Sequence, residues 1–147
     1  MSKSLLIAAA ALLVSITPAA AQTAIKLFVA DSLQPAMAEL ASEFQKSTGG
    51  QFKLEPVIGP AAALRARIET GETAHVFVTA DIADAKALAD AGRTRGPAVP
   101  LARPKAGGGP LGFVVMKNAP PAAGELAGFL RFGAGQKILA KYGFGAP

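Results

Sequence analysis

The sequence predicts an α/β fold, with an open, mostly parallel, doubly wound sheet flanked by helices. Strand-like and helix-like patterns alternate from about residue 24 to residue 91, and glycines follow the helical stretches. After a Pro/Gly-rich stretch, one more strand pattern and two helical patterns complete the chain. Such alternation is typical of a parallel sheet covered by helices, and right-handed crossovers favour an open, doubly wound order.

Three strand–helix pairs make up the first part. Ser32 is the expected N-cap of the first helix, and Pro35 suits its first turn. Gly49-Gly50, Gly71 and Gly92 each follow a helical pattern, as expected at helix C-termini. The expected strands are Ala24–Ala30, Phe52–Val57 and His75–Thr79, and the expected helices are Gln34–Ser47, Ala61–Thr70 and Ile82–Ala91.

The later part begins with the Pro/Gly-rich stretch from Gly96 to Pro110, which contains three consecutive glycines. Within it, Ala98–Leu101 is expected to form a short edge strand. The remaining expected elements are a strand at Leu111–Met116 and helices at Ala122–Phe132 and Gly135–Tyr142.

The N-terminus has the order of a secretory signal peptide. Lys3 precedes an apolar run from Leu5 to Ile16, and Pro18 and the small residues Ala19 to Ala21 follow. The run is shorter than the ~20 residues that span a bilayer, and no cysteine follows it to carry a lipid anchor. We therefore expect cleavage near Ala21 and an exported single domain of residues 22–147.

The composition argues against several classes of function. The absence of cysteine excludes disulfides, thiol catalysis and cysteine metal sites. The formal net charge is +5, but the basic residues are scattered with few aromatic residues between them, so no nucleic-acid surface is predicted. His75 is the only histidine, and no catalytic triad order, paired carboxylate motif or phosphate-binding fingerprint accompanies it. The chain is not expected to be an enzyme or to carry a cofactor.

A binding site is expected beyond the carboxyl ends of the first three strands. The loops there are Asp31-Ser32, Gly59-Pro60-Ala61 and Ala80-Asp81. Helix N-termini offer free N–H groups and partial positive charge, which hold anions, and Ser32 adds a hydroxyl donor. Alternatively, Ser32 only caps its helix and Gly59-Pro60 only turns the chain. Asp31 and Asp81 are also candidate caps, and a carboxylate there would repel an anion.

Several segments resemble one protein family. IKLFVADSLQPAMAELASEFQKSTG, from Ile25, resembles the opening of periplasmic molybdate-binding proteins, the solute-binding components of oxyanion ABC transporters. The segments 59–81, 87–93 and 110–144 are similar to later parts of that family, and GQKILAKYGF is the most specific piece. The resemblance implies a type II periplasmic-binding fold, a periplasmic location and an ABC permease as partner. Its implied ligand is a tetrahedral oxyanion, with molybdate, tungstate and sulfate as candidates.

The resemblance also implies a set of ligand-binding residues. Ser32 matches the family's first ligand serine. Ala61 stands where the Gly-Pro-Ser-Gly form of the second loop has another serine, so a backbone N–H is kept and a hydroxyl is lost. The family usually has Asp in place of His75. The expected ligand-binding residues are Asp31, Ser32, Gly59, Pro60 and Ala61.

A second lobe of the family is missing from this chain. The family's chain crosses into a second lobe and returns, whereas here the return strand at Leu111 follows the first lobe after a short link. On the order of 100 residues are absent. We expect a first βα part at 22–95, a link at 96–110 in place of the second lobe, and a return part at 111–147. Anion binding is expected to be weak. The alternatives are a secreted, non-transport module that dimerises through its uncovered cleft face, and a non-functional remnant.

Overall fold

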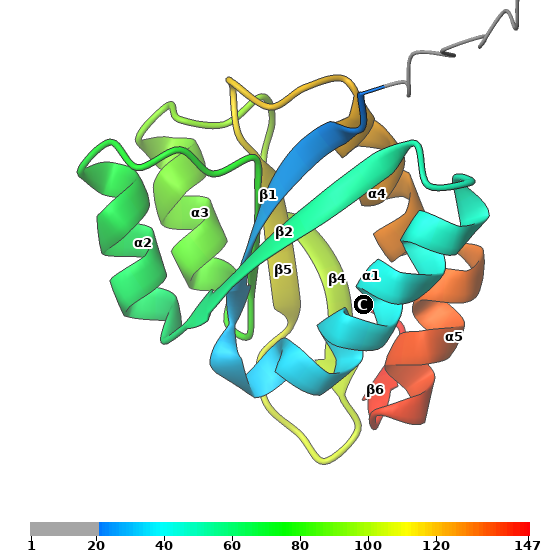
Figure 1. The fold of residues 1–147 in the computed structure, drawn as a ribbon. Helices are drawn as coiled ribbons and strands as arrows, with labels where there is room; N and C mark the ends of the chain where they lie inside the picture. The colour runs from blue at the N-terminus through cyan, green and yellow to red at the C-terminus, as the bar shows by residue number, and fades with distance from the viewer. Residues whose placement is uncertain (1–20) are drawn as a thin grey trace, which may run out of the picture.

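The structure, a computed structural model, describes residues 21–147 and shows one sheet with helices on both faces (Figure 1). The predicted signal peptide lies, apart from Ala21, outside the described residues. The strands are β1 Thr23–Ala30, β2 Phe52–Gly59, β3 Val76–Thr79, β4 Val99–Pro104, β5 Leu111–Val115 and β6 Phe144–Gly145. The helices are the 3-10 helix η1 Asp31–Leu33, α1 Gln34–Ser47, α2 Ala61–Glu69, α3 Ile82–Asp90, α4 Ala122–Arg131 and α5 Gly133–Lys141.

The predicted α/β single-lobe fold is confirmed, but the sheet is mixed rather than mostly parallel. The strand order is β2-β1-β3-β5-β4-β6. β1 pairs in parallel with β2 and β3, whereas the pairings of β5 with β3, β4 with β5 and β6 with β4 are antiparallel. The short connection at residues 105–110 explains the antiparallel pairing of β4 with β5, because parallel neighbours require a long crossover and antiparallel neighbours do not.

The Pro/Gly-rich stretch contributes more structure than the sequence suggested. β4 extends to Pro104, beyond the predicted Ala98–Leu101, and lies between β5 and β6. β6 pairs with the end of β4 at Arg103 and Pro104. The predicted segment Ala98–Leu101 pairs with β5 alone, as an edge strand does, whereas the unpredicted extension at Arg103 and Pro104 gains a partner from the far end of the sequence.

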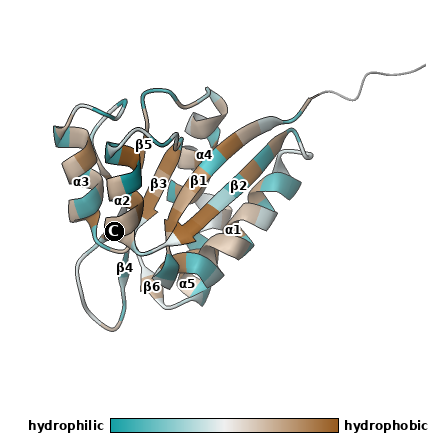
Figure 2. Ribbon diagram, turned by 60° about the vertical axis from the view of Figure 1, so that its left-hand side comes forward, coloured by the Kyte–Doolittle hydropathy of each residue, from teal (hydrophilic) through white to brown (hydrophobic). Residues whose placement is uncertain are grey.

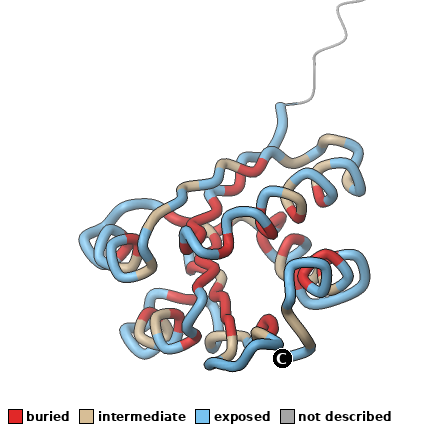
Figure 3. Tube along the Cα trace, turned by 90° about the horizontal axis from the view of Figure 1, so that it is seen from below, coloured by how far each residue is buried: buried red, intermediate tan, exposed pale blue. Residues whose placement is uncertain are grey.

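The core has one layer on each face of the sheet. α1, α4 and α5 cover one face, where Phe44 stacks on Phe52 with ring centroids 5.9 Å apart and meets Phe129 edge-on at 5.4 Å. α2 and α3 cover the other face, where Phe28 and Phe77 are fully buried. Figure 2 shows apolar residues concentrated along the central strands, and Figure 3 shows buried residues there and on the inner sides of the helices. No helix in residues 21–147 has both the length and the apolarity needed to cross a membrane.

The predicted helix ends are confirmed at two glycines, and the predicted start of the first helix is wrong. Gly71 and Gly92 have φ of 106° and 70°, a conformation that favours glycine, so they end α2 and α3 as predicted. The predicted N-cap at Ser32 is wrong: Ser32 lies inside η1, and the N-cap of α1 is Leu33, without a side-chain cap. The added 3-10 turn explains this, because it places Ser32 one residue before the cap position.

Close packing at Gly112 gives a test of the fold. A Cβ at Gly112 of β5 would lie 2.4 Å from Cγ1 of Ile82, at the start of α3. We expect Gly112→Ala to destabilise the protein by about 1–3 kcal/mol, because the buried contact has to be relieved by backbone or rotamer shifts. Urea unfolding measures the change. Gly124→Ala in α4 is the control, since its Cβ meets nothing within 4 Å and alanine favours the helix by up to about 1 kcal/mol. Equal stability of the two variants would contradict the packing described here.

Candidate functional site

The carboxyl ends of β1, β2 and β3 meet at one edge of the sheet, at the bottom of Figure 1. Ala30, the last residue of β1, pairs with Gly59, the last residue of β2. Neighbouring strands lie about 4.8 Å apart, so the segment Asp31-Ser32 begins beside the segment Pro60-Ala61. The register therefore brings together the five residues that the sequence predicted as ligand-binding.

The start of α2 supplies free backbone donors at this edge. Pro60 is the N-cap and makes no side-chain cap, and the first intrahelical bond is donated by Leu64 N–H to the Pro60 carbonyl, at 3.0 Å. The N–H groups of residues 61–63 precede that bond and have no intrahelical acceptor. They lie at the positive end of the helix dipole, which favours an anion.

Asp31 and Ser32 interact with each other at the start of η1. The Ser32 N–H donates to Asp31 Oδ1 at 2.8 Å, and both residues are exposed. Within residues 21–147, no hydrogen bond of the Ser32 hydroxyl is found. The carboxylate therefore occupies the backbone donor that a bound anion would use, while the hydroxyl is available.

A polar network that the sequence analysis missed surrounds the third loop, Ala80-Asp81. Arg65 of α2 donates to Asp84 Oδ1 at 2.9 Å, and the buried Thr79 hydroxyl donates to Asp84 Oδ2 at 3.4 Å. Asp81 accepts the Ala83 N–H at 2.9 Å, so its predicted alternative role as a cap is confirmed. Because Asp84 neutralises Arg65, this loop adds no uncompensated cation to the edge. Arg65 also lies near Glu69, one helical turn further along α2, with 3.5 Å between Nε and Oε1. This spacing is the one part of the network that the sequence could have indicated.

The turn between β4 and β5 lies at the same edge. β4 runs parallel to β3, since both are antiparallel to β5. The carboxyl end of β4, from which the turn starts, therefore lies at the same edge as the carboxyl end of β3. The Pro110 carbonyl accepts the N–H of Ile82, the first residue of α3, at 3.1 Å. The segment that the sequence predicts to replace the second lobe therefore ends beside the loops that carry the candidate site.

His75 lies at the opposite end of the sheet. The imidazole Nδ1 accepts the backbone N–H of Lys26 at 2.9 Å, and the backbone N–H of His75 donates to the Lys26 carbonyl at 2.9 Å. Burial, and to a smaller extent the Lys26 ammonium, lower the pKa of His75, against the opposing effect of Glu55. The imidazole is thus a neutral acceptor that ties the start of β3 to β1, a role that a carboxylate at this position would also fill.

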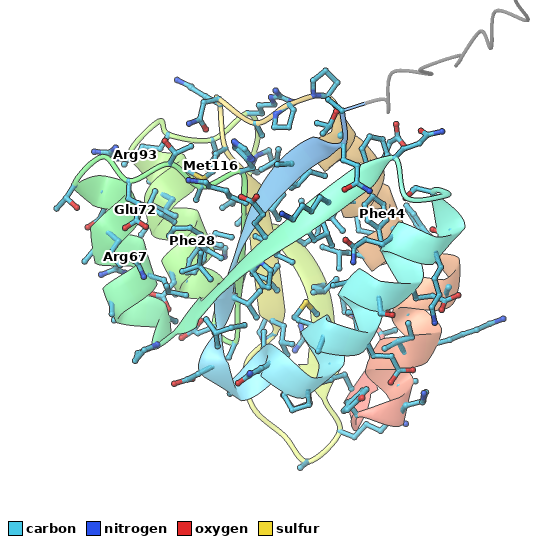
Figure 4. The ribbon with its side chains drawn as sticks, viewed as in Figure 1. Phe28, Phe44, Arg67, Glu72, Arg93 and Met116 are labelled. Atoms are coloured by element: carbon cyan, nitrogen blue, oxygen red, sulfur yellow. The ribbon has the colours of Figure 1, made fainter. Side chains whose placement is uncertain are left out.

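A hollow of about 260 Å³ near the end of α2 has the charged residues Glu72, Arg93 and Lys117 in its lining. Arg67, labelled in Figure 4, donates to both carboxylate oxygens of Glu72 at 2.6 and 2.5 Å and lies 5.4 Å from the ring centroid of Phe28. Arg93 donates to two carbonyls in the last turn of α2. These contacts hold Arg67 and Arg93 at the end of α2. Lys117 also lines the hollow and has no salt bridge among the described residues.

Comparison with known proteins identifies the family. The sequence model of the family described as bacterial extracellular solute-binding protein matches residues 25–107. That span is more than half of the chain and includes all three loops of the candidate site. The chain belongs to this family. No curated protein sequence matches it.

Solved structures of low sequence identity share the fold of this solute-binding protein. A chain assigned as the substrate-binding domain of a molybdenum ABC transporter from Clostridium difficile matches with TM-score 0.77 and 14% identity, over 86% of this chain and 100% of that chain. The periplasmic molybdate-binding protein of Azotobacter vinelandii matches with TM-score 0.74 and 13% identity, over 84% and 99%. The sulfate-binding protein SubI of Mycobacterium tuberculosis matches with TM-score 0.71 and 11% identity, over 84% and 86%.

These matches confirm the predicted resemblance to periplasmic molybdate-binding proteins. The homologous proteins are solute-binding proteins and not enzymes, as the sequence analysis expected. The family is extracellular, in agreement with the expected export. The individual ligand-binding residues stay a prediction.

The contact of His75 predicts a pH dependence of stability. Because the pKa of His75 is lowered on folding, the unfolded chain takes up a proton first as the pH falls. The stabilisation is therefore fully present above pH ~6.5, the usual histidine pKa, and is lost below it. His75→Asn keeps an oxygen acceptor but cannot titrate there. We expect wild type to lose more unfolding free energy than the variant between about pH 7.5 and about pH 5, measured by urea unfolding. Identical losses would show that His75 does not contribute.

Proposed function

We propose that this solute-binding protein is a periplasmic, single-lobe binder of a tetrahedral oxyanion such as molybdate, tungstate or sulfate. The pairing of Ala30 with Gly59 supports the proposal, because the segments Asp31-Ser32 and Pro60-Ala61 follow these paired residues at the same edge of the sheet. The anion would accept hydrogen bonds from the Ser32 hydroxyl and from backbone N–H groups of Ala61 and the residues after it. The Gly59-Pro60 turn lets the anion approach the backbone, and signal cleavage near Ala21 would deliver the protein to the periplasm.

Binding by one lobe would be weaker than binding by two. Two-lobed periplasmic binding proteins enclose their ligand by hinge closure, whereas this edge is open and the bound anion would stay partly hydrated. We interpret residues 22–95 and 111–147 as the two parts of one lobe, with the link at 96–110 in place of the second. The family relationship suggests an ABC permease as partner, although an open half-site offers it no closed form to recognise.

The two serine positions give the direct test of the site. We expect Ser32→Ala to weaken binding and Ala61→Ser to strengthen it, each by about ten- to a hundredfold, because a hydrogen bond to a charged group contributes about 1.5–3 kcal/mol. Calorimetric titration with molybdate, tungstate and sulfate gives the affinities. Ala66→Ser, exposed and more than one turn further into α2, is the matched control for the added hydroxyl. A folded protein that shows no heat with millimolar anion would refute the binding proposal.

The charge of Asp31 gives a second test. Asp31→Asn keeps an oxygen that can accept the Ser32 N–H but removes the negative charge beside the site. We expect about thirtyfold tighter binding of a dianion, because its repulsion by a unit charge about 4 Å away in water is about 2 kcal/mol, with a smaller gain in high salt. Asp90→Asn is the control. Asp90 lies at the C-terminal end of α3, away from the loop that precedes this helix, so the variant changes the net charge equally and should leave the affinity unchanged. If both variants tighten binding alike, the anion is attracted by net charge and not by this site.

Light scattering on the same samples addresses the alternative of a non-transport module. A monomer that binds anion supports the proposal. A dimer that binds none would favour association through the uncovered edge.

A further inference from the structure

A groove lies between α4 and the strands β4 and β5, on the face of the sheet that α1, α4 and α5 cover. It consists of two adjoining hollows of about 400 and 420 Å³, which share Val99 and Arg131. Val99, Phe113 and Val115 of the strands form the apolar floor of the first hollow. Each volume is in the range of small-molecule sites, which are mostly apolar with a few placed polar groups.

The groove is open because the facing side of α4 has small residues. Gly124, Ala127, Gly128 and Arg131 have the spacing of one helix face and line the first hollow. A Cβ at Gly124 or Gly128 would meet no atom within 4 Å. Glycine in a helix interior is destabilising relative to alanine. Gly124 and Gly128 therefore make α4 less stable than alanines would, and both lie beside the same open space.

The rim of the groove is positively charged. Arg95 and Arg131 line the first hollow, and Arg103 and Arg131 line the second. No aspartate or glutamate lines either hollow, and no salt bridge of these three arginines is found in residues 21–147, although the C-terminal residue Pro147 lines the second hollow. Arg95 donates to the Ala119 carbonyl, which fixes its position without neutralising its charge.

An aromatic ring lies beside the shared arginine. The guanidinium of Arg131 lies 5.0 Å from the ring centroid of Phe132, and Phe132 is 63% exposed. Phe132 lines the second hollow together with Leu101 and Pro110. The groove therefore combines unneutralised guanidinium groups with apolar surface on both sides of Arg131.

We propose that this groove binds a small organic carboxylate with an apolar body. Guanidinium pairs with carboxylate through two parallel hydrogen bonds, and the apolar floor would cover the body of the ligand. Charge complementarity selects this occupant: an inorganic anion would leave the floor uncovered, and an uncharged apolar molecule would leave the arginines without a counter-ion. The groove shares no lining residue with the five candidate oxyanion-binding residues, and binding in it does not depend on binding there.

The test is an amide NMR titration of the full protein with 3-phenylpropionate, compared with 3-phenylpropanol and acetate. We expect 3-phenylpropionate to shift the amides of Gly96, Val99 and Gly128 and to leave those of Ser32 and Ala61 unchanged. The alcohol and acetate should each bind at least about tenfold more weakly, since each lacks either the charge-assisted hydrogen bonds or the apolar contact. Equal binding of either compound, shifts elsewhere, or no shifts at millimolar acid would overturn the proposal.

Two variants assign the binding to the groove. Gly128→Leu fills the first hollow and Arg131→Gln removes the shared cation, and each should weaken binding at least about tenfold. Gly128→Ala keeps the helix intact and should weaken binding less, so it replaces the leucine variant if that protein does not fold. Ala66→Leu on α2 and Lys86→Gln on α3, both exposed on the other side of the sheet, are the matched controls. Wild-type affinity in Arg131→Gln, or loss in the controls, would contradict the assignment.

Discussion

The position of β1 between β2 and β3 is the constraint on which the rest of the structure depends. β1 is paired on both sides, and its residues from Leu27 to Ala30 are buried. A shift of one residue would exchange the two faces of the strand and move Phe28 from the layer under α2 and α3 to the layer under α1, α4 and α5. The same register decides which loops become neighbours, so core packing and the geometry of the candidate site are fixed together.

Local patterns were sufficient to predict most of the fold, because each of the first three helices ends at a glycine and each of the first three strands is a compact run of strand-forming residues. What they could not predict depends on distant partners. β6 is two residues long and is a strand only because it pairs with Arg103 and Pro104. The antiparallel direction of β5 follows from the short turn before it, and a Pro/Gly-rich stretch is compatible with either a linker or a hairpin.

The candidate site was predictable in place but not in detail. The sequence located the loops, since parallel strands direct their carboxyl ends to one edge. It could not show that Asp31 accepts the Ser32 N–H or that Asp84 neutralises Arg65, because these contacts depend on side-chain directions around turns. The role of His75 was equally hidden, since its partner is the backbone of Lys26, far away in the sequence. The arginine-lined groove requires α4 and β4 to be packed together, so no single segment indicates it.

The turn between β4 and β5 has a consequence for how the protein folds. It contains six residues, 105–110, so two strands inside the sheet are also neighbours in the sequence. The entropy lost on closing a loop increases with the logarithm of its length, and pairings between nearby residues form faster than distant ones. The β4–β5 hairpin can therefore form early, as a local unit, and present a paired edge on which β3 completes the sheet. The slow step is then left to the parallel pairings of β1, which must bring together segments separated by whole helices.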